Sequence, residues 1–377
     1  MPAFGQQWKR FRVAWIALLL LTIASNRLGA GAPPQADDAT RAALAANALQ
    51  AWYSGRTGLY NSTGWWNSAN AITALADESR VTGSREYWPV FSNTFIAAQK
   101  TSAGFLNKFY DDEGWWAMAW IDVYDLTHED RYLAMAQSIF ADMAGGWDAT
   151  CGGGIWWSKD RKYKNAIANE LFLDVAAALA NRTEGADQRG YAAWARKEWR
   201  WFAQSGMINA SHTINDGLNS DEPNGACVNN GKTVWTYNQG VILGGLTELS
   251  QTEHNPALLM NAQEIAAAAM ATLTDAQGIL HDPCEPKCGA DGTQFKGILA
   301  RNLHILNQAQ AVPGYEVFVF ANVQSVWAQT RRDGDRLGAQ WAAPYGAANA
   351  SSQSSALDLL VAAAALAGKP ADSAHPE

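Results

Sequence analysis

The hydrophobic positions of this chain follow two helical patterns. Segment 38–53 repeats its apolar residues at i, i+3, i+4 and i+7, from Ala45 to Trp52, with polar residues elsewhere. This spacing is typical of an outer helix with one buried face. Segment 234–249 contains the almost wholly apolar run 241–246, which predicts a helix buried on all sides. The same buried pattern recurs in segments 117–126, 166–180, 297–308 and 356–367.

The buried helices belong to a repeating unit. Each begins with a Gly- or Asn-rich loop that carries aromatic or polar residues, and a polar break and a second helix follow. Six such loops begin near residues 64, 114, 155, 233, 294 and 351. Their irregular spacing suits helical hairpins with connecting loops, and strand signals are sparse. We therefore predict an all-α fold, an (α/α)6 barrel of six helical hairpins.

The predicted barrel spans residues 36–367, because no long linker interrupts that range. A basic stretch, a twelve-residue apolar run at 13–24 and small residues at 30–32 indicate that residues 1–32 are a secretory signal peptide. Twelve residues are too few to span a bilayer, although an uncleaved anchor extended upstream is the alternative. Residues 368–377 form a polar tail, so the apolar segment before them is interpreted as a last helix and not as a lipid-anchor signal.

The charge balance is acidic. Lys and Arg number 28 and Asp and Glu number 36, which gives a net charge of −8 at pH 7. Removing residues 1–32 deletes four positive charges and no acids, so the net charge becomes −12. Such a chain is a poor partner for nucleic acid or an anionic membrane. The six histidines show no metal-ligand spacing, and we expect a monomer without metal, cofactor or transmembrane helix in the mature chain.

Glycosylation signals and cysteines agree with secretion. Four Asn-x-Ser/Thr sequons predict N-glycosylation in a eukaryotic host, at Asn61, Asn181, Asn209 and Asn349. The four cysteines form an even set suited to two disulfides. Cys284 and Cys288 can close a local loop, which leaves Cys151 to meet Cys227. The alternative is a zinc site with the nearby His281, but a secreted chain favours disulfides.

Two adjacent carboxylates run straight into a pair of tryptophans at residues 110–116. Paired acids commonly break glycosidic bonds, and flat indole faces suit the apolar faces of a sugar. At a helix entry, adjacent side chains can hold their carboxyl groups the ~5–5.5 Å apart that a retaining glycosidase needs. Asp111 and Asp112 are therefore candidate catalytic residues. The alternatives are capping of the following helix and a calcium site that includes Glu113.

In such a barrel the loops that enter the inner helices gather at one end, so aromatic and polar residues there are candidate sugar ligands. They are Trp65, Trp115, Trp116, Trp157, Asp216, Tyr237, Asn238, Gln239 and Phe295. An ordinary turn is the alternative for Asp216, and helix capping is the alternative for residues 237–239. Other helix acids, such as Glu170 and Asp174, are expected to face solvent or pair with Lys and Arg.

Four motifs together resemble glycoside hydrolase family 76, over about residues 36–367. They are Tyr110-Asp-Asp-Glu-Gly-Trp-Trp116, Trp120-Ile-Asp-Val-Tyr-Asp-Leu-Thr127, Gly153-Gly-Ile-Trp-Trp157 and Trp235-Thr-Tyr-Asn-Gln-Gly240. The family includes endo-α-1,6-mannanases and fungal cell-wall proteins thought to be transglycosidases. The resemblance implies an (α/α)6 barrel and retention of anomeric configuration. It also implies that Asp111 is the nucleophile and Asp112 the acid/base.

The expected function is that of a secreted, fungal-type retaining hydrolase that cleaves internal α-1,6-mannosidic linkages by double displacement. Its expected partner is α-mannan or another mannose-containing cell-wall polysaccharide, and its expected location is extracellular or cell-wall associated. One alternative is a transglycosidase in which a sugar acceptor replaces water. The other is a non-catalytic carbohydrate-binding protein, which would not need adjacent carboxylates.

Overall fold

The computed structural model of the protein describes residues 37–219 and 227–368. The predicted signal peptide, residues 1–32, and the polar tail from residue 369 lie outside these ranges. Within them the chain forms twelve α-helices: α1 (Asp38–Leu49), α2 (Trp65–Thr82), α3 (Trp88–Ala97), α4 (Tyr110–Thr127), α5 (Asp130–Ala144), α6 (Ala166–Arg182), α7 (Gly185–Gln204), α8 (Thr236–Glu253), α9 (Pro256–Leu273), α10 (Phe295–Ala309), α11 (Tyr315–Ser325) and α12 (Ala350–Ala367). The described strands form two short antiparallel pairs, β1 (Tyr53–Ser54) with β2 (Leu59–Tyr60), and β3 (Leu218–Asn219) with β4 (Val228–Asn229).

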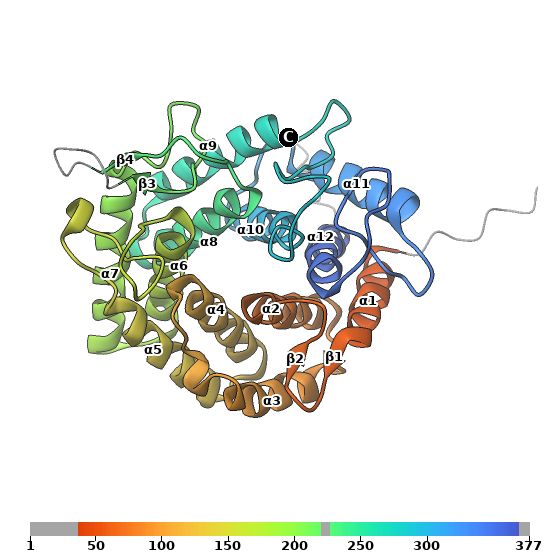
Figure 1. Ribbon diagram of the computed structural model, residues 1–377, viewed down its shortest axis with the longest axis horizontal. Coiled ribbons are helices and arrows are strands. Elements are labelled where there is room, and N and C mark those ends of the chain that lie inside the picture. The colour runs from red at the N-terminus through yellow and green to blue at the C-terminus, as the bar shows by residue number, and fades with distance from the viewer. Residues whose placement is uncertain (1–36, 220–226, 369–377) are drawn as a thin grey trace, which may run out of the picture. The chain divides into compact units, whose positions relative to one another are not determined.

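The even-numbered helices form a closed inner ring. Each packs against the next, from α2 through α4, α6, α8 and α10 to α12, and α12 packs back against α2. The odd-numbered helices lie outside this ring (Figure 1). Helix α1 packs against α12, so the last hairpin joins the first and last described helices. The prediction of an all-α (α/α)6 barrel is confirmed.

The inner helices begin and pack as their sequences dictate. Asn165 caps α6 by accepting a hydrogen bond from the backbone N–H of Ala168, and an Asn in this role satisfies a free helix donor. In α8, a Cβ at Gly240 would lie 2.7 Å from Cα of Leu299 in α10. A side chain there would force α8 and α10 apart, so glycine is needed for their close approach.

Helix α12 is long and apolar enough to cross a membrane by length and composition alone, with a mean hydropathy of 1.2. However, 83% of this stretch is buried inside the barrel, so its composition is explained by its place in the inner ring. The helix begins at Ala350, six residues before the predicted segment 356–367. The sequence pattern missed this start because residues 351–355 are polar, although they are buried in the structure. The hydroxyl of Ser355, for example, accepts a hydrogen bond of 2.8 Å from the backbone N–H of Gly297.

Two acids of α6 correct an expectation from the sequence. Glu170 and Asp174 neither face solvent nor pair with a cation: they are 0% and 4% exposed. Neither oxygen of Glu170 has a hydrogen-bond partner, and one oxygen of Asp174 also lacks one. Burial raises the pKa of both carboxyl groups well above the ordinary range. Two acids that the sequence pattern assigned to the surface are therefore buried in the inner ring.

All four cysteines are in disulfides, Cys151–Cys227 and Cys284–Cys288, as predicted. The first joins the loop before α6 to the segment of β4, across 76 residues. Because both sulfurs of Cys284 and Cys288 are bonded to each other, they cannot serve as thiolate ligands. The zinc alternative is therefore wrong.

The long disulfide is expected to contribute more to stability than the short one. Replacing Cys151 and Cys227 by alanine should cost about 4 kcal/mol, because the closed loop restricts the unfolded chain; the same change at Cys284 and Cys288 should cost about 2 kcal/mol. Thermal unfolding of the two double variants checks this, with a fall in melting temperature of about 5–10 °C for the first. A larger fall for the short disulfide would contradict the entropic argument.

Candidate active site

A groove of about 220 Å³ lies where the N-termini of several inner helices meet the loops before them. Its lining residues are Trp66, Asp111, Trp115, Trp157, Tyr163, Asn165, Asp216, Tyr237, Asp291 and Phe295. Six of these were predicted from the sequence, namely Asp111, Trp115, Trp157, Asp216, Tyr237 and Phe295. The loops that enter the inner helices therefore do bring candidate acids and aromatic side chains to one place.

A row of stacked rings forms one side of the groove. Trp66 stacks on Trp115 with ring centroids 5.5 Å apart and on Phe295 at 6.2 Å. Phe295 stacks on Tyr237 at 3.9 Å with an interplanar angle of 5°. These side chains come from α2, α4, α8 and α10, so the barrel itself fixes their positions. A continuous aromatic surface of this kind suits the apolar faces of successive sugar rings.

Asp111 lies in the first turn of α4. One of its carboxylate oxygens accepts a hydrogen bond of 3.0 Å from the indole N–H of Trp157, and the other is buried without a partner. Burial, and then the charge of Asp112, raises the pKa of Asp111 well above its ordinary value. The Trp157 indole and the backbone N–H groups at the start of the helix oppose that rise.

Asp112 follows at the next position and has its own donor. The side-chain amide of Asn107 donates a hydrogen bond of 2.5 Å to Asp112 Oδ2. Burial raises the pKa of Asp112 to about 6, the Asn107 hydrogen bond opposes the rise, and the charge of Asp291 adds to it. Two such neighbours titrate as a pair. Burial and mutual repulsion favour the state in which the pair shares one proton and carries one negative charge.

The two alternatives for the acid pair fit the structure less well. Phe109 is the N-cap residue of α4, and no side-chain hydrogen bond caps this helix. Glu113 is 0% exposed and pairs with Lys159 at 2.8 Å, so its carboxylate is occupied by a cation. Among the described residues, the one group of potential metal ligands close enough to share an ion is Asp282, Cys284 and Cys288, and its sulfurs form a disulfide.

Asp216 stands on another wall of the groove. Its carboxylate accepts hydrogen bonds from the hydroxyl of Tyr163 at 2.5 Å and from the indole N–H of Trp235 at 3.1 Å. Asn230 in turn donates to the Tyr163 hydroxyl at 2.9 Å. Burial and the neighbouring Asp216 raise the pKa of Tyr163. Both Asp216 oxygens accept hydrogen bonds, which fix the orientation of its carboxylate in the groove wall.

Four predicted sugar ligands do not line the groove. Trp116, Asn238 and Gln239 are each 0% exposed, so the expectation that they contact substrate is wrong. Gln239 instead binds the backbone of Ile214, accepting from its N–H at 2.8 Å and donating to its carbonyl at 2.9 Å. Trp65 packs on Phe105 and Trp116, with ring centroids 6.1 and 5.0 Å away.

Helix geometry explains why the wrong tryptophans were assigned to the groove. The tryptophan pairs at 65–66 and 115–116 lie inside helices, where consecutive side chains diverge by about 100°. Only one member of each pair can face the groove, and these are Trp66 and Trp115. The rotation of about 100° between consecutive helix residues could have identified Trp66 as the member of its pair that faces the groove. Tyr163, Asn165 and Asp291 also line the groove, and nothing in their local sequence marked them.

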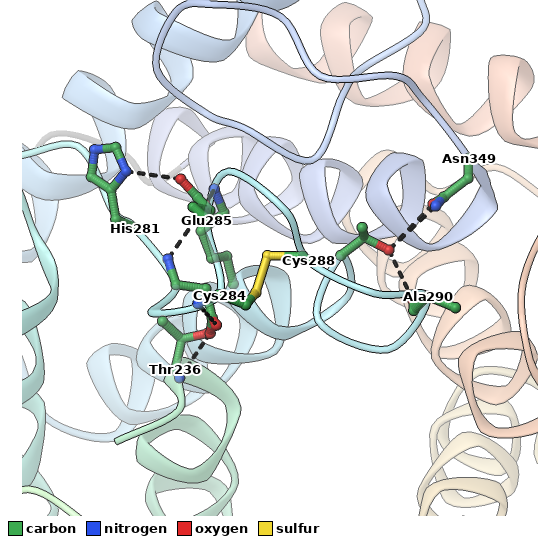
Figure 2. The surroundings of a disulfide bond; sticks show 10 residues. Thr236, His281, Cys284, Glu285, Cys288, Ala290 and Asn349 are labelled. Atoms are coloured by element: carbon green, nitrogen blue, oxygen red, sulfur yellow. Dashed lines mark hydrogen bonds and ion pairs between the residues drawn. A yellow bond between two sulfur atoms is a disulfide. The ribbon is translucent and has the colours of Figure 1, made fainter. Parts of the chain in front are cut away.

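The loop before α10 positions Asp291. Figure 2 shows its disulfide, Cys284–Cys288, and the contacts around it. Asp282 anchors the loop to the start of α8 by accepting from the backbone N–H and hydroxyl of Thr236 at 3.2 and 2.7 Å. Asp291 accepts a hydrogen bond of 2.9 Å from the indole N–H of Trp66. The loop thereby joins a carboxylate to the aromatic row.

The four sequons differ in the freedom of their side-chain amides, to which a glycan would be attached. Asn61 and Asn181 are exposed, whereas Asn209 and Asn349 are half-buried. The Asn181 amide donates to Glu248, and the Asn209 amide donates to two neighbouring side chains. Asn349 caps α12. Glycosylation remains a prediction, and Asn61 is the most open site of the four.

An (α/α)6 barrel whose groove is lined by stacked aromatic rings and by Asp111, one member of an adjacent acid pair, is the architecture of a carbohydrate-active protein. The family model described as glycosyl hydrolase family 76 matches residues 37–374. The chain belongs to this family, as the motifs indicated.

Curated relatives and solved structures agree. The chain is 26% identical to mannan endo-1,6-alpha-mannosidase DCW1 of Saccharomyces cerevisiae, over 74% of this chain and 66% of the relative. It is 25% identical to mannan endo-1,6-alpha-mannosidase DFG5 of Candida albicans, over 68% and 61%. The chain thus spans less than two thirds of these relatives.

Among solved structures, the α-1,6-mannanase GH76A of Salegentibacter matches with a TM-score of 0.78 and 26% identity, over 88% of this chain and 100% of that one. A variant of that enzyme made inactive by replacing two consecutive aspartates with alanine, in complex with α-1,6-mannotetrose, matches with a TM-score of 0.79 and 25% identity, over the same shares of the two chains.

Proposed function

We propose that this protein is a secreted, retaining glycoside hydrolase that cleaves internal α-1,6-mannosidic linkages. The observation that carries the proposal is the placement of Asp111 and Asp112 at the helix entry beside the aromatic groove. The substrate class is supported by the relatives, whose names specify α-1,6-mannan. A variant of one of them in which two consecutive aspartates are replaced is inactive.

In the first half-reaction Asp111 attacks the anomeric carbon of a mannose unit and forms a glycosyl-enzyme ester. Asp112 gives its proton to the departing glycosidic oxygen at the same time. The shared proton of the pair suits this step, because one carboxyl group must be ionised and the other protonated. The Trp157 indole and the helix N-terminus stabilise the negative charge on Asp111.

In the second half-reaction Asp112, now a carboxylate, removes a proton from water. The water attacks the anomeric carbon and releases Asp111. Two inversions return the original α configuration. A transglycosidase would share the first half-reaction and use a sugar hydroxyl in place of water, and the products of the two reactions differ.

The protein acts outside the cell. All four cysteines are in disulfides, which persist in oxidising compartments. The predicted signal peptide agrees with this location.

Product analysis tests the activity. Purified protein incubated with linear α-1,6-mannan should release a ladder of short α-1,6-mannooligosaccharides, because the proposed cleavage is at internal linkages. With α-1,6-mannotetraose alone, products longer than the substrate would reveal transfer. Binding without any cleavage would contradict the proposal and favour a carbohydrate-binding protein.

The stereochemistry of the products tests the mechanism without a mutation. Adjacent residues can hardly stand ~6.5–9.5 Å apart, as the carboxyl groups of an inverting enzyme do. Proton NMR of an early digest should therefore show α reducing ends first, with the β anomer growing in later by mutarotation. If β ends appear first, a catalytic carboxylate lies elsewhere in the groove.

A further inference from the structure

Two short segments, 107–110 and 157–159, meet beside the acid pair. Phe109 and Ser158 form an antiparallel bridge, and two backbone hydrogen bonds of 2.9 Å join the segments on either side of it. The first segment leads into α4, and the second follows the loop that carries Cys151. The start of α4 and this loop are therefore fixed to each other at the candidate site.

One side chain from each segment donates a hydrogen bond to the acid pair, Asp111 and Asp112. Trp157 donates to Asp111 at 3.0 Å, and Asn107 donates to Asp112 at 2.5 Å. The orientation of the Asn107 amide is fixed, because its oxygen accepts a hydrogen bond of 2.7 Å from the backbone N–H of Phe109. Its nitrogen must then be the atom that faces Asp112.

An ion pair between the buried Glu113 and the exposed Lys159 lies behind Asn107. The backbone N–H of Asn107 donates to Glu113 Oε1 at 3.0 Å, and Lys159 lies 2.8 Å from the same carboxylate oxygen. Lys159 also lies 2.8 Å from a carboxylate oxygen of Asp142 in α5. Burial raises the pKa of Glu113 to about 8, and Lys159 opposes that rise.

The charged groups around Asp112 come from three sides. Asp111 is its neighbour in α4, and Lys159 and Glu113 lie behind Asn107. Asp291, in the loop before α10, lines the same groove as Asp111, and its negative charge raises the pKa of Asp112. The amide of Asn107 and the carboxylate of Asp291 thus act on Asp112 in opposite directions.

We propose that Asn107 is a positioning residue that holds Asp112 for proton transfer, and that Asp291 opposes it through its negative charge. This inference rests on the proposed function, in which Asp112 is the acid/base. When Asp112 gives its proton to the glycosidic oxygen it becomes a carboxylate, and its hydrogen bond from Asn107 becomes charge-assisted and stronger. The bond therefore stabilises the transition state more than the starting state. In the second step Asp112 recovers a proton from water, and the original bond returns.

The pH dependence of kcat/KM should show the two opposing effects. The upper limb of the profile reports loss of the proton of the acid. Asn107→Ala removes a donor that favours the ionised form, so this limb should move to higher pH by about one unit. Asp291→Asn removes a negative charge and should move the same limb to lower pH. Asn107→Ala should also reduce kcat by about 10- to 100-fold and leave KM near its original value.

Two further variants separate positioning from folding. Asn255→Ala is the matched control, because Asn255 likewise accepts a hydrogen bond from the backbone N–H two residues on, at 3.1 Å, but lies at the start of α9. It should keep the activity and the pH profile of the original protein. Asn107→Asp retains the oxygen that accepts from Phe109, but it replaces the donor with an acceptor and adds a negative charge beside Asp112, and both changes raise the pKa of Asp112. If Asn107→Ala does not fold, this variant should still move the upper limb to higher pH.

A titration without substrate tests the geometry independently of the reaction. The carboxyl carbon of Asp112, assigned by its absence in Asp112→Asn, is followed by carbon-13 NMR in protein with labelled aspartate. Its titration should move up in Asn107→Ala and down in Asp291→Asn, even if the protein does not cleave α-1,6-mannan. Absence of cleavage by the original protein would contradict only the proposed function. Unchanged titrations, or shifts in the same direction for both variants, would overturn the positioning role.

Discussion

Replacing Asp111 with asparagine should reduce turnover of α-1,6-mannan by about 10⁴-fold or more, because an amide cannot form the glycosyl-enzyme ester. The fold should be kept, since asparagine has nearly the same shape and its oxygen can still accept the Trp157 hydrogen bond. Circular dichroism and the initial rate on linear mannan measure the two outcomes. Activity close to that of the original protein would contradict the assignment of the nucleophile.

The same variant should be at least as stable as the original protein at pH 7. Burial and the charge of Asp112 raise the pKa of Asp111 in the folded state above its unfolded value. An acid shifted in this direction destabilises the fold as pH rises above the unfolded pKa. Removing its charge should therefore raise or maintain the melting temperature at neutral pH, and the difference should disappear below about pH 4.

If Asp111 mainly caps α4, Asp111→Asn should lower the melting temperature and not raise or maintain it. A stability measurement therefore separates the capping interpretation from the catalytic one. If the favourable contact between the Asp111 charge and the N-terminus of α4 outweighed the effect of burial, loss of the charge would lower the melting temperature. Asp130→Asn is the matched control, since Asp130 is an exposed acid in the first turn of α5. That variant should lose a few tenths of a kcal/mol of stability, and up to about 1 kcal/mol, with no loss of activity.

The helical pattern of the sequence predicts the barrel because each inner helix is apolar on all sides, a property that only a closed ring can accommodate. It misplaces helix starts where polar residues are buried. Residues 351–355 look like a loop but lie inside the inner ring. In α4 the sequence marks only 117–126, whereas the helix begins at Tyr110 and takes the acid pair into its first turn.

The site was only partly accessible from the sequence. Asp111 and Trp115 could be found because they share one motif at one helix entry, where local spacing decides the geometry. Asp291 reaches the groove through a loop whose position depends on Asp282, a disulfide and the indole of Trp66. These contacts are tertiary, and no period or motif in the sequence encodes them.

Buried polar side chains show why the remaining errors occurred. Gln239 and Asn238 follow Tyr237 at the entrance of α8, and all three look equally suited to a sugar. Only Tyr237 lines the groove, whereas Gln239 satisfies the backbone of Ile214 inside the barrel wall. A buried polar group needs a partner, and the sequence does not show whether that partner is a ligand or the chain itself.

Replacing Asp112 with asparagine should have a smaller effect, and one that depends on the substrate. On α-1,6-mannan the loss should be about 10²- to 10⁴-fold, the usual contribution of general acid–base catalysis. An α-mannobioside with a nitrophenyl leaving group should lose much less in the first half-reaction, because a nitrophenolate departs without a proton. Asp111→Asn should lose activity equally on both substrates, so the ratio of the two rates distinguishes a nucleophile from an acid.

The second half-reaction of Asp112→Asn gives an independent result. Without a base, water attacks the glycosyl-enzyme ester slowly, and the intermediate should accumulate on the nitrophenyl substrate. Azide is already an anion and needs no base, so it should displace Asp111 from the anomeric carbon and release an α-mannobiosyl azide. Proton NMR identifies its configuration. If azide neither accelerates turnover nor appears in the product, Asp112 is not the acid/base, and the hydrogen bond from Asn107 then serves only to hold the start of α4.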